Sequence, residues 1–235
     1  MIYKDISARE IDAVLKQSQD AFVQYRAVKG IVKAAFLEQI ATGIEALDRA
    51  RFERVVRAHR QVRHVISGHV HRPGAYEYPL GTRLETLLEA AGGVQGHLKA
   101  IIVGGLSVPI LTAKEAEGLL LDYDSCMKRG TMLGSGGIMV MNETTSIPEV
   151  ACRAISFYAH ESCGQCTPCR QGSHVVSKLL HRITSGHGER KDIDRVLKLC
   201  EAIKGTTLCP TGEAFSTPIE AMVRKFRPEF EARIR

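Results

Sequence analysis

The sequence predicts an α+β protein with an N-terminal helical segment, a small α+β domain and a C-terminal helical bundle. Three observations predict this class. Apolar residues recur at helical spacing at both ends of the chain, short apolar segments bounded by glycine and proline lie between them, and three closely spaced cysteines precede a distant fourth. The 235 residues are 44% apolar, which is enough for about one to three small domains.

Residues 1–61 are predicted to be helical. Ser7 with Glu10, and Thr42 with Glu45, have the spacing of a capping box, in which two side chains satisfy the first N–H groups of a helix. We interpret this segment as a docking element or a remnant of a longer domain.

The predicted N-terminal segment ends in a basic series with a spacing of three, which keeps its side chains on one face. With a net charge of +6 for the chain, such a face fits a solvated surface or an acidic protein partner. No nucleic-acid motif accompanies it, so we expect no nucleic-acid partner, and the sequence leaves the role of the series open. The series consists of Arg51, Arg54, Arg57, Arg60 and Arg63.

Residues 62–112 change to short strands. Residues 62–67 and 75–78 flank the turn His71-Arg-Pro-Gly74, and this pattern predicts a β-hairpin. Two strands, a helix and a further strand in about fifty residues are typical of a β-grasp-like α+β domain.

The helix of this domain is predicted over residues 84–91, where Thr82 and Glu85 have capping-box spacing. Residues 100–103 form a short apolar run stopped by two glycines, which predicts a buried strand.

Residues 113–145 are predicted to be a glycine-rich linker with one strand over residues 138–141. Gly134-Ser-Gly-Gly137 precedes that strand, whereas a phosphate-binding loop follows a strand and opens a helix. We therefore interpret it as a turn in which backbones pack closely.

Residues 146–235 are predicted to form the helical bundle. Ser146 and Glu149 have capping-box spacing before the first helix. The predicted helices run up to Cys163, from the cysteine loop to Gly186, over residues 192–203, and over residues 213–227 before Pro228.

The segment Glu161-Ser-Cys-Gly-Gln-Cys-Thr-Pro-Cys-Arg170 places three thiols at C-x2-C-x2-C spacing on one tight loop. Their sulfurs can converge on one inorganic centre, and a distant fourth cysteine can complete the ligand set. Structural zinc usually takes two separate pairs of ligands. The spacing therefore favours a 4Fe-4S cluster, with zinc or a redox-active thiol set as alternatives.

The three clustered ligands are Cys163, Cys166 and Cys169, and either Cys200 or Cys209 can supply the fourth. Cys200 falls on the apolar stripe of a predicted helix, which is typical of a buried core thiol. Cys209 lies in a loop followed by proline, so we favour it as the fourth ligand.

Arg170 immediately follows the third cysteine at a predicted helix start. Its charge and the helix N–H groups would stabilise an anionic cluster and raise its reduction potential. The alternative is that Arg170 is only a solvated residue at the start of a helix. We interpret His160, Glu161 and His174 as residues around the site or on the surface rather than as ligands.

Seven cysteines are too few for a disulfide scaffold, and the isolated Cys126 and Cys152 are predicted to be packing residues. The first residues are polar, unlike a signal peptide, and no apolar run approaches the roughly 20 residues that span a bilayer. We therefore predict a cytoplasmic protein without direct membrane insertion, which a complex could bring to the membrane periphery.

Several motifs occur together between residues 65 and 230: Ser67-Gly-His-Val-His-Arg-Pro-Gly74, Pro79-Leu-Gly-Thr82, Leu133-Gly-Ser-Gly-Gly137, Met141-Asn-Glu-Thr-Thr145, the cysteine loop from Phe157 to Arg170, and Gly205-Thr-Thr-Leu-Cys209. This combination resembles the C-terminal half of the NADH-binding flavoprotein subunit of NADH:quinone oxidoreductase (respiratory complex I). The same subunit type recurs in NAD-linked hydrogenases and formate dehydrogenases. The first two motifs resemble the family's soluble ligand-binding β-grasp (SLBB) domain.

In that family the four matching cysteines bind a 4Fe-4S cluster that accepts single electrons from a flavin reduced by NADH. By this resemblance Cys163, Cys166, Cys169 and Cys209 are the cluster ligands, and other flavin-bearing and iron–sulfur subunits of an oxidoreductase complex are the partners. The family's Gly-Arg-Gly-Gly-Ala-Gly-Phe-Pro-like loop, which serves FMN and NADH, has no counterpart in residues 1–61. FMN and NADH are therefore expected only on a partner or on a full-length relative.

The leading functional interpretation is a 4Fe-4S electron-transfer component of an NADH dehydrogenase (quinone)-type complex. The alternative is a regulatory or structural module in which the cluster stabilises the fold or senses redox state. A self-sufficient NADH dehydrogenase is disfavoured by the missing flavin loop. The sequence leaves open whether the flavin domain is lost or separately encoded.

Overall fold

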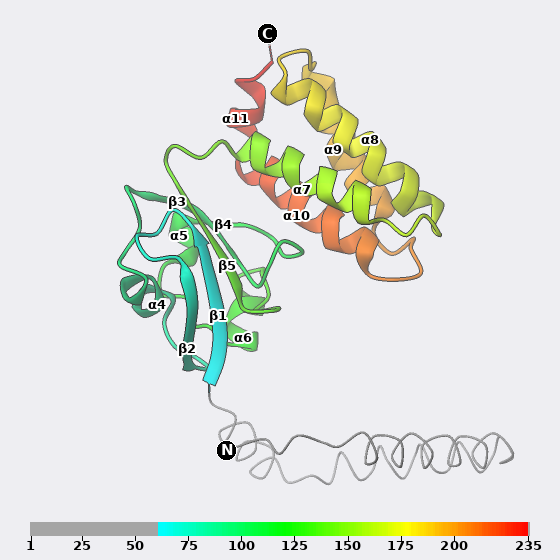
Figure 1. Ribbon diagram of the computed structural model, residues 1–235. Helices are drawn as coiled ribbons and strands as arrows, with labels where there is room; N and C mark the ends of the chain where they lie inside the picture. Colours follow the sequence, from blue (N-terminus) through cyan, green and yellow to red (C-terminus); the bar gives the residue numbers. More distant parts are fainter. Residues whose placement is uncertain (1–60, 235) are drawn as a thin grey trace, which may run out of the picture. The chain divides into compact units, whose positions relative to one another are not determined.

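The structure is a computed structural model that describes residues 61–234 (Figure 1). The helices predicted for residues 1–60, with their two capping boxes and the first four arginines of the basic series, lie outside the described residues. The strands are β1 (Gln61–Gly68), β2 (Gly74–Pro79), β3 (Leu98–Val103), β4 (Leu111–Thr112) and β5 (Gly137–Asn142). The helices are α4 (Leu84–Ala90), α5 (Ala113–Ala116), α6 (Tyr123–Lys128), α7 (Ile147–Glu161), α8 (Thr167–Thr184), α9 (Arg190–Ile203), α10 (Thr211–Lys225) and α11 (Arg227–Glu231).

The strands form one five-stranded mixed sheet in the order β2-β1-β5-β3-β4. β1 and β2 pair antiparallel, with Val62 opposite Tyr78, and this confirms the predicted hairpin. β5 pairs parallel with β1 and antiparallel with β3. Together with the helices, this sheet confirms the predicted α+β class for the described residues.

β3 is buried on both faces, and its alternating side chains enter two different cores. Ile101 and Val103 pack into a core with α4 and the residues around α5 and α6. Ala100 and Ile102 pack into a second core with α7 to α10. A stretch of strand covered on both faces is apolar, which explains why residues 100–103 lack a polar–apolar alternation.

The segment predicted as a linker, residues 113–145, contributes more than a connection. It contains α5, α6 and β5, and β5 lies between β1 and β3 in the middle of the sheet. The predicted strand is confirmed, but its central position depends on pairing with distant strands, which local sequence does not indicate.

The capping box predicted at Thr82 and Glu85 is wrong. The residue that precedes α4 is Arg83, and no side chain caps the helix. The Thr82 hydroxyl donates to the carbonyl of Pro79 at 2.6 Å, and the Glu85 carboxylate accepts from the Gly118 N–H at 2.5 Å. Both side chains therefore form hydrogen bonds with groups outside the first turn of α4.

The capping box predicted at Ser146 and Glu149 is also wrong. Ser146 does precede α7, but its side chain caps no N–H group. The Arg233 guanidinium instead donates to the Ser146 hydroxyl at 3.0 Å and to the Glu149 carboxylate at 2.9 Å. An arginine near the end of the chain therefore holds the start of α7.

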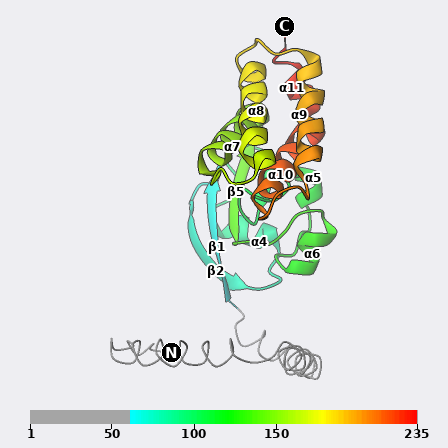
Figure 2. The ribbon, with the colours of Figure 1, turned by 90° about the vertical axis from the view of Figure 1, so that its right-hand side faces the viewer.

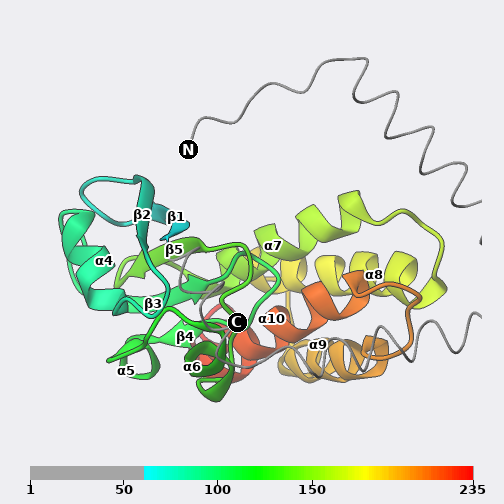
Figure 3. The ribbon, with the colours of Figure 1, turned by 90° about the horizontal axis from the view of Figure 1, so that it is seen from below.

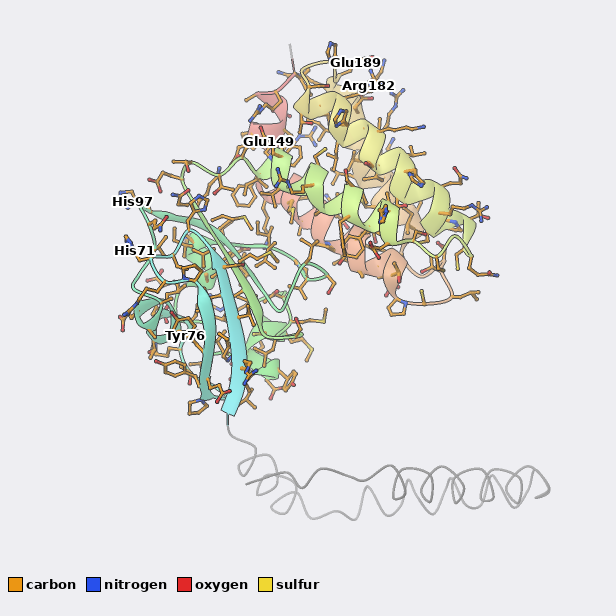
Figure 4. All side chains as sticks on the ribbon, in the orientation of Figure 1. His71, Tyr76, His97, Glu149, Arg182 and Glu189 are labelled. Atoms are coloured by element: carbon orange, nitrogen blue, oxygen red, sulfur yellow. The ribbon has the colours of Figure 1, made fainter. Side chains whose placement is uncertain are left out.

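Two capping boxes occur where the sequence analysis did not expect them. Thr112 and Glu115 cap α5, and Glu189 and Asp192 cap α9. Asp192 is fully buried, and Arg182 of α8 lies 3.5 Å from its carboxylate and 3.6 Å from that of Glu189. Figure 4 shows Arg182 and Glu189 side by side where α8 leads into α9.

Helices α7, α8, α9 and α10 pack side by side into a bundle (Figure 2). The last predicted helix is divided, because α10 ends at Lys225 and Pro228 lies in the first turn of α11 rather than after the end of a helix. None of the described helices is long and apolar enough to cross a membrane.

Two lysines join the sheet to the bundle. Lys225 of α10 donates to the carbonyl of Ile110 and to the Glu115 carboxylate, both at 2.8 Å. Lys99 of β3 pairs with Glu229 of α11 at 2.8 Å. All four charged groups are partly shielded from solvent, so these contacts fix the bundle against the sheet more firmly than fully exposed pairs would.

The interpretation of the glycine-rich turn as a close backbone approach is confirmed. Gly134 has φ +48°, and a Cβ at this position would lie 2.1 Å from the carbonyl oxygen of Gly104. The turn before β5 therefore packs directly on the backbone that follows β3.

We expect Gly134→Ala to lower the free energy of unfolding by about 3 kcal/mol, because left-handed strain and a backbone clash add together. Gly130→Ala is the matched control, since Gly130 has φ +73° and open space around its Cα. The control should lose only about 1 kcal/mol. Urea unfolding followed by circular dichroism measures both values, and equal losses would contradict the close approach.

His64 is a second unusual feature of the sheet. Its side chain is fully buried on β1, and neither ring nitrogen has a hydrogen-bond partner within the described part of the chain. Burial disfavours the charged imidazolium and so lowers the pKa of His64 below its ordinary value of 6.5.

The lowered pKa makes folding stability depend on pH. Between the ordinary and the lowered pKa the unfolded chain binds a proton that the folded chain does not, so stability falls as the pH drops below about 6.5. We expect His64→Leu to lose less stability than the wild type between pH 7 and pH 5. His71→Gln, at an exposed position, should retain the wild-type loss. Chemical denaturation at both pH values tests this, and parallel losses in the wild type and His64→Leu would refute it.

Candidate metal centre

The two cysteine-bearing loops lie at the same end of the helical bundle. Residues 162–166 connect α7 to α8, and residues 204–210 connect α9 to α10 (Figures 1 and 3). The Leu208 N–H donates to the Cys166 sulfur at 3.3 Å. This hydrogen bond joins segments 42 residues apart in the chain.

Small residues allow the loops to meet. A Cβ on Gly172, in α8, would lie 2.5 Å from Cδ1 of Ile203 at the end of α9. A Cβ on Gly212, in α10, would lie 2.7 Å from the Thr207 side chain. Both glycines therefore let the segment before Cys209 pack against the helices that flank the cysteine loops.

Cys169 lies in the first turn of α8, and its side chain is buried. The Ser162 hydroxyl lies 3.3 Å from the Cys169 sulfur. Ser162 follows the last residue of α7, and its N–H donates to the carbonyl of Tyr158 at 3.0 Å. The end of one helix thus places a hydroxyl against a sulfur at the start of the next.

Cys166 precedes the first residue of α8, and no side chain caps this helix start. The first turn of α8 contains no acidic residue. The positive end of the helix dipole therefore faces the cysteine loop with no carboxylate in its own first turn to offset it, which favours negative charge at this position.

Cys209 is exposed on the second loop. Its sulfur lies 3.3 Å from the Thr211 hydroxyl. Hydrogen bonding with the hydroxyl and the backbone of Thr211 lowers the pKa of the Cys209 thiol below its ordinary range. The thiolate, which is the form that binds metals, therefore forms more readily here than on a free cysteine.

The Arg170 guanidinium donates to the carbonyl of Gly164, so it spans the cysteine loop as well as reaching solvent. Because of this contact, Arg170 is more than a solvated residue at the start of a helix. Its proposed effect on a reduction potential stays a prediction.

The structure brings the two loops together without forming a binding site for a single metal ion among the described residues. Among residues 61–234, no group of three or more histidine, cysteine, aspartate or glutamate side chains is arranged to hold a metal ion. Cys163 is exposed on the first loop, like Cys209 on the second. The donor chemistry still fits a 4Fe-4S cluster, since four thiols lie on two adjoining loops with N–H and O–H donors at two of their sulfurs.

The remaining cysteines are placed differently. Cys200 and Cys126 are fully buried, and burial raises their pKa values to about 12 and about 11, so they are protonated core residues. Cys152 is half-buried, and its sulfur lies 3.9 Å from Nδ1 of His181 and 3.8 Å from the Thr184 hydroxyl. The structure therefore separates all three from the two cysteine loops.

The polar residues near the cysteine loop in sequence are on the surface. His160 and Glu161 pair with each other at 3.0 Å and are both exposed. His174 is exposed on α8.

Sequence reasoning missed three groups that contact the cysteine sulfurs. These are the Ser162 hydroxyl, the Leu208 N–H and the Thr211 hydroxyl. Ser162 and Thr211 lie within two residues of predicted ligands, so a hydroxyl search around the cysteines would have found them. The Leu208 contact depends on the packing of distant helices and has no local signal.

Two family descriptions match this chain. Residues 149–233 match the NADH-ubiquinone oxidoreductase-F iron-sulfur binding region, and residues 65–108 match the SLBB domain. The first region contains all four predicted ligands, and the second contains β2, α4, β3 and the second half of β1.

Among curated relatives, an NADH-quinone oxidoreductase subunit of Rickettsia rickettsii (strain Sheila Smith) is 45% identical over 174 residues, which are 72% of this chain and 41% of the relative. An NADH-quinone oxidoreductase subunit of Rhizobium meliloti (strain 1021) is 42% identical over 172 residues, with the same coverage. The chain thus spans about two-fifths of the length of these relatives.

A solved structure of an NAD+-reducing [NiFe]-hydrogenase in the H2-reduced state is 29% identical, with a TM-score of 0.66 over 74% of this chain and 29% of that chain. The air-oxidized state gives a TM-score of 0.67 at the same identity. The described part of this chain therefore carries an SLBB domain and an NADH-ubiquinone oxidoreductase-F iron-sulfur binding region, and its resemblance to the C-terminal half of the NADH-binding flavoprotein subunit of NADH:quinone oxidoreductase and related hydrogenases is confirmed.

Proposed function

We propose that Cys163, Cys166, Cys169 and Cys209 hold one 4Fe-4S cluster, and that this chain is the electron-transfer component of an NADH dehydrogenase (quinone)-type complex. The observation that carries the proposal is the hydrogen bond from the Leu208 N–H to the Cys166 sulfur, because it joins the two loops that bear the ligands. When bound, a cluster of this kind takes up and releases single electrons.

The chain's own residues suit such a site. The start of α8 favours the negative charge of a thiolate-bound cluster, and Arg170 fixes the loop through the Gly164 carbonyl while adding a positive charge. Cys163 and Cys209 are exposed whereas Cys169 is buried, so one side of the site lies at the protein surface. An electron can pass there to or from a partner without crossing the bundle.

The partners we propose are the flavin-bearing and iron–sulfur subunits of an oxidoreductase complex. The relatives are NADH-quinone oxidoreductase subunits, and the structural neighbour is an NAD+-reducing hydrogenase. In this proposal FMN and NADH bind to a partner subunit, and the cluster site of this chain receives the electrons.

The cluster itself gives the first prediction of this proposal. We expect the chain, purified without oxygen, to contain about four irons and four acid-labile sulfides per molecule. After reduction with dithionite it should give the EPR signal of a reduced cluster, and Cys209→Ala should lose both the signal and most of the iron.

Cys152→Ser is the matched control, because Cys152 is half-buried on α7 and lies outside both loops. It should retain the wild-type iron, sulfide and EPR signal. Zinc without sulfide in the wild type, or a full cluster in Cys209→Ala, would overturn the ligand assignment.

A further prediction concerns NADH. We expect the isolated chain to purify without flavin and to show no NADH-driven reduction of an electron-accepting dye, whereas dithionite reduces its cluster. Flavin fluorescence released on denaturation, or dye reduction by NADH, would place the hydride-accepting site on this chain instead.

A further inference from the structure

We infer that two hydrogen-bond donors of this chain, the Ser162 hydroxyl and the Leu208 N–H, raise the reduction potential of the cluster through the Cys169 and Cys166 sulfurs. The inference rests on the proposed function and deepens it, since it names the residues that tune the same site.

The Ser162 hydroxyl would be the donor to a metal-bound Cys169 sulfur. The Gly164 N–H donates to the Ser162 oxygen at 3.4 Å and occupies one of its lone pairs. The Cys169 sulfur lies 3.3 Å from the same oxygen. A metal-bound thiolate carries no proton, so in the loaded site the hydroxyl is the only possible donor of this pair.

Burial makes this contact specific. Cys169 is only 6% exposed, so water has little access to replace the hydroxyl at its sulfur. Ser162 is also held by its own N–H, which donates to the carbonyl of Tyr158. The end of α7 therefore holds the Ser162 main chain from which the hydroxyl reaches the sulfur.

The Leu208 N–H acts on a different sulfur and from a different loop. It donates to the Cys166 sulfur at 3.3 Å, and the leucine side chain itself is 85% exposed. The contact is therefore made by the backbone amide and not by the leucine side chain. Any substitution at this position that retains the N–H should leave the reduction potential near the wild-type value.

The direction of the effect follows from charge. A reduced cluster carries one more negative charge than an oxidised cluster, and a hydrogen bond to a ligand sulfur becomes stronger as that sulfur becomes more negative. The two donors therefore stabilise the reduced form more than the oxidised form, and removing either donor lowers the reduction potential.

The test is an anaerobic redox titration of the full chain followed by EPR. We expect the midpoint potential of Ser162→Ala to move to a more negative value, with iron and sulfide content unchanged. Ser162→Thr retains the hydroxyl and should return towards the wild-type potential. Leu208→Ala retains the N–H and should leave the potential unchanged.

Ser156→Ala is the matched control. Ser156 lies on the same helix, and its hydroxyl donates to the carbonyl of Cys152 at 2.8 Å. It should leave the potential unchanged. A fully loaded Ser162→Ala with the wild-type potential would overturn the inference alone, whereas a wild-type chain without iron and sulfide would overturn the proposed function.

A measurement on the wild type does not depend on the stability of any variant. Electron–nuclear double resonance of the reduced protein should show strongly coupled protons that disappear after exchange into D2O. Their absence would overturn the inference even if Ser162→Ala failed to bind the cluster.

Discussion

The site depends on the close packing of α8 against α9, which brings two separate loops to one place. Gly172 allows Ile203 to reach the surface of α8, and the chain that leaves α9 then passes beside the cysteine loop. The Leu208 N–H meets the Cys166 sulfur as a result. A larger residue at position 172 would move the second loop away, and the four thiols would then lie on two unconnected surfaces. The proposed ligand set therefore depends on helix packing as much as on cysteine spacing.

The sheet also stabilises this packing, because residues of β3 belong to the same core as the bundle helices. β3 sends alternate side chains into both cores, so the bundle packs on a strand that is itself held by α4 and its neighbours. Lys225 and Lys99 add polar contacts between the sheet and the bundle. The two cores and these contacts stabilise the fold, so the cysteine loops can expose polar groups and thiols without contributing to its stability.

Much of the fold could be predicted from local pattern, since the hairpin of β1 and β2, α4, β3 and the bundle helices follow from apolar periodicity and glycine positions. The capping boxes at Thr82 and Ser146 were wrong because distant groups, the Gly118 N–H and Arg233, compete for the same side chains. The central place of β5 was missed for a related reason, because strand order is set by pairing between segments far apart in the chain. Cysteine spacing identifies the loops by itself, but which N–H and O–H groups reach the sulfurs depends on packing.

The position of the cysteines bears on whether a cluster here would carry electrons or hold the fold. The bundle core is already filled by apolar side chains such as Phe215, Ile219 and Met222, and the buried Cys200 lies among them as a protonated thiol. Cys169 belongs to this core, whereas Cys163 and Cys209 are exposed. A cluster needed mainly to hold the helices together would be expected to be enclosed on all sides by the helices. A cluster held at the edge of the core, with one exposed side beside a helix N-terminus and hydrogen-bond donors that favour added negative charge, would be placed for taking up electrons and passing them to a partner.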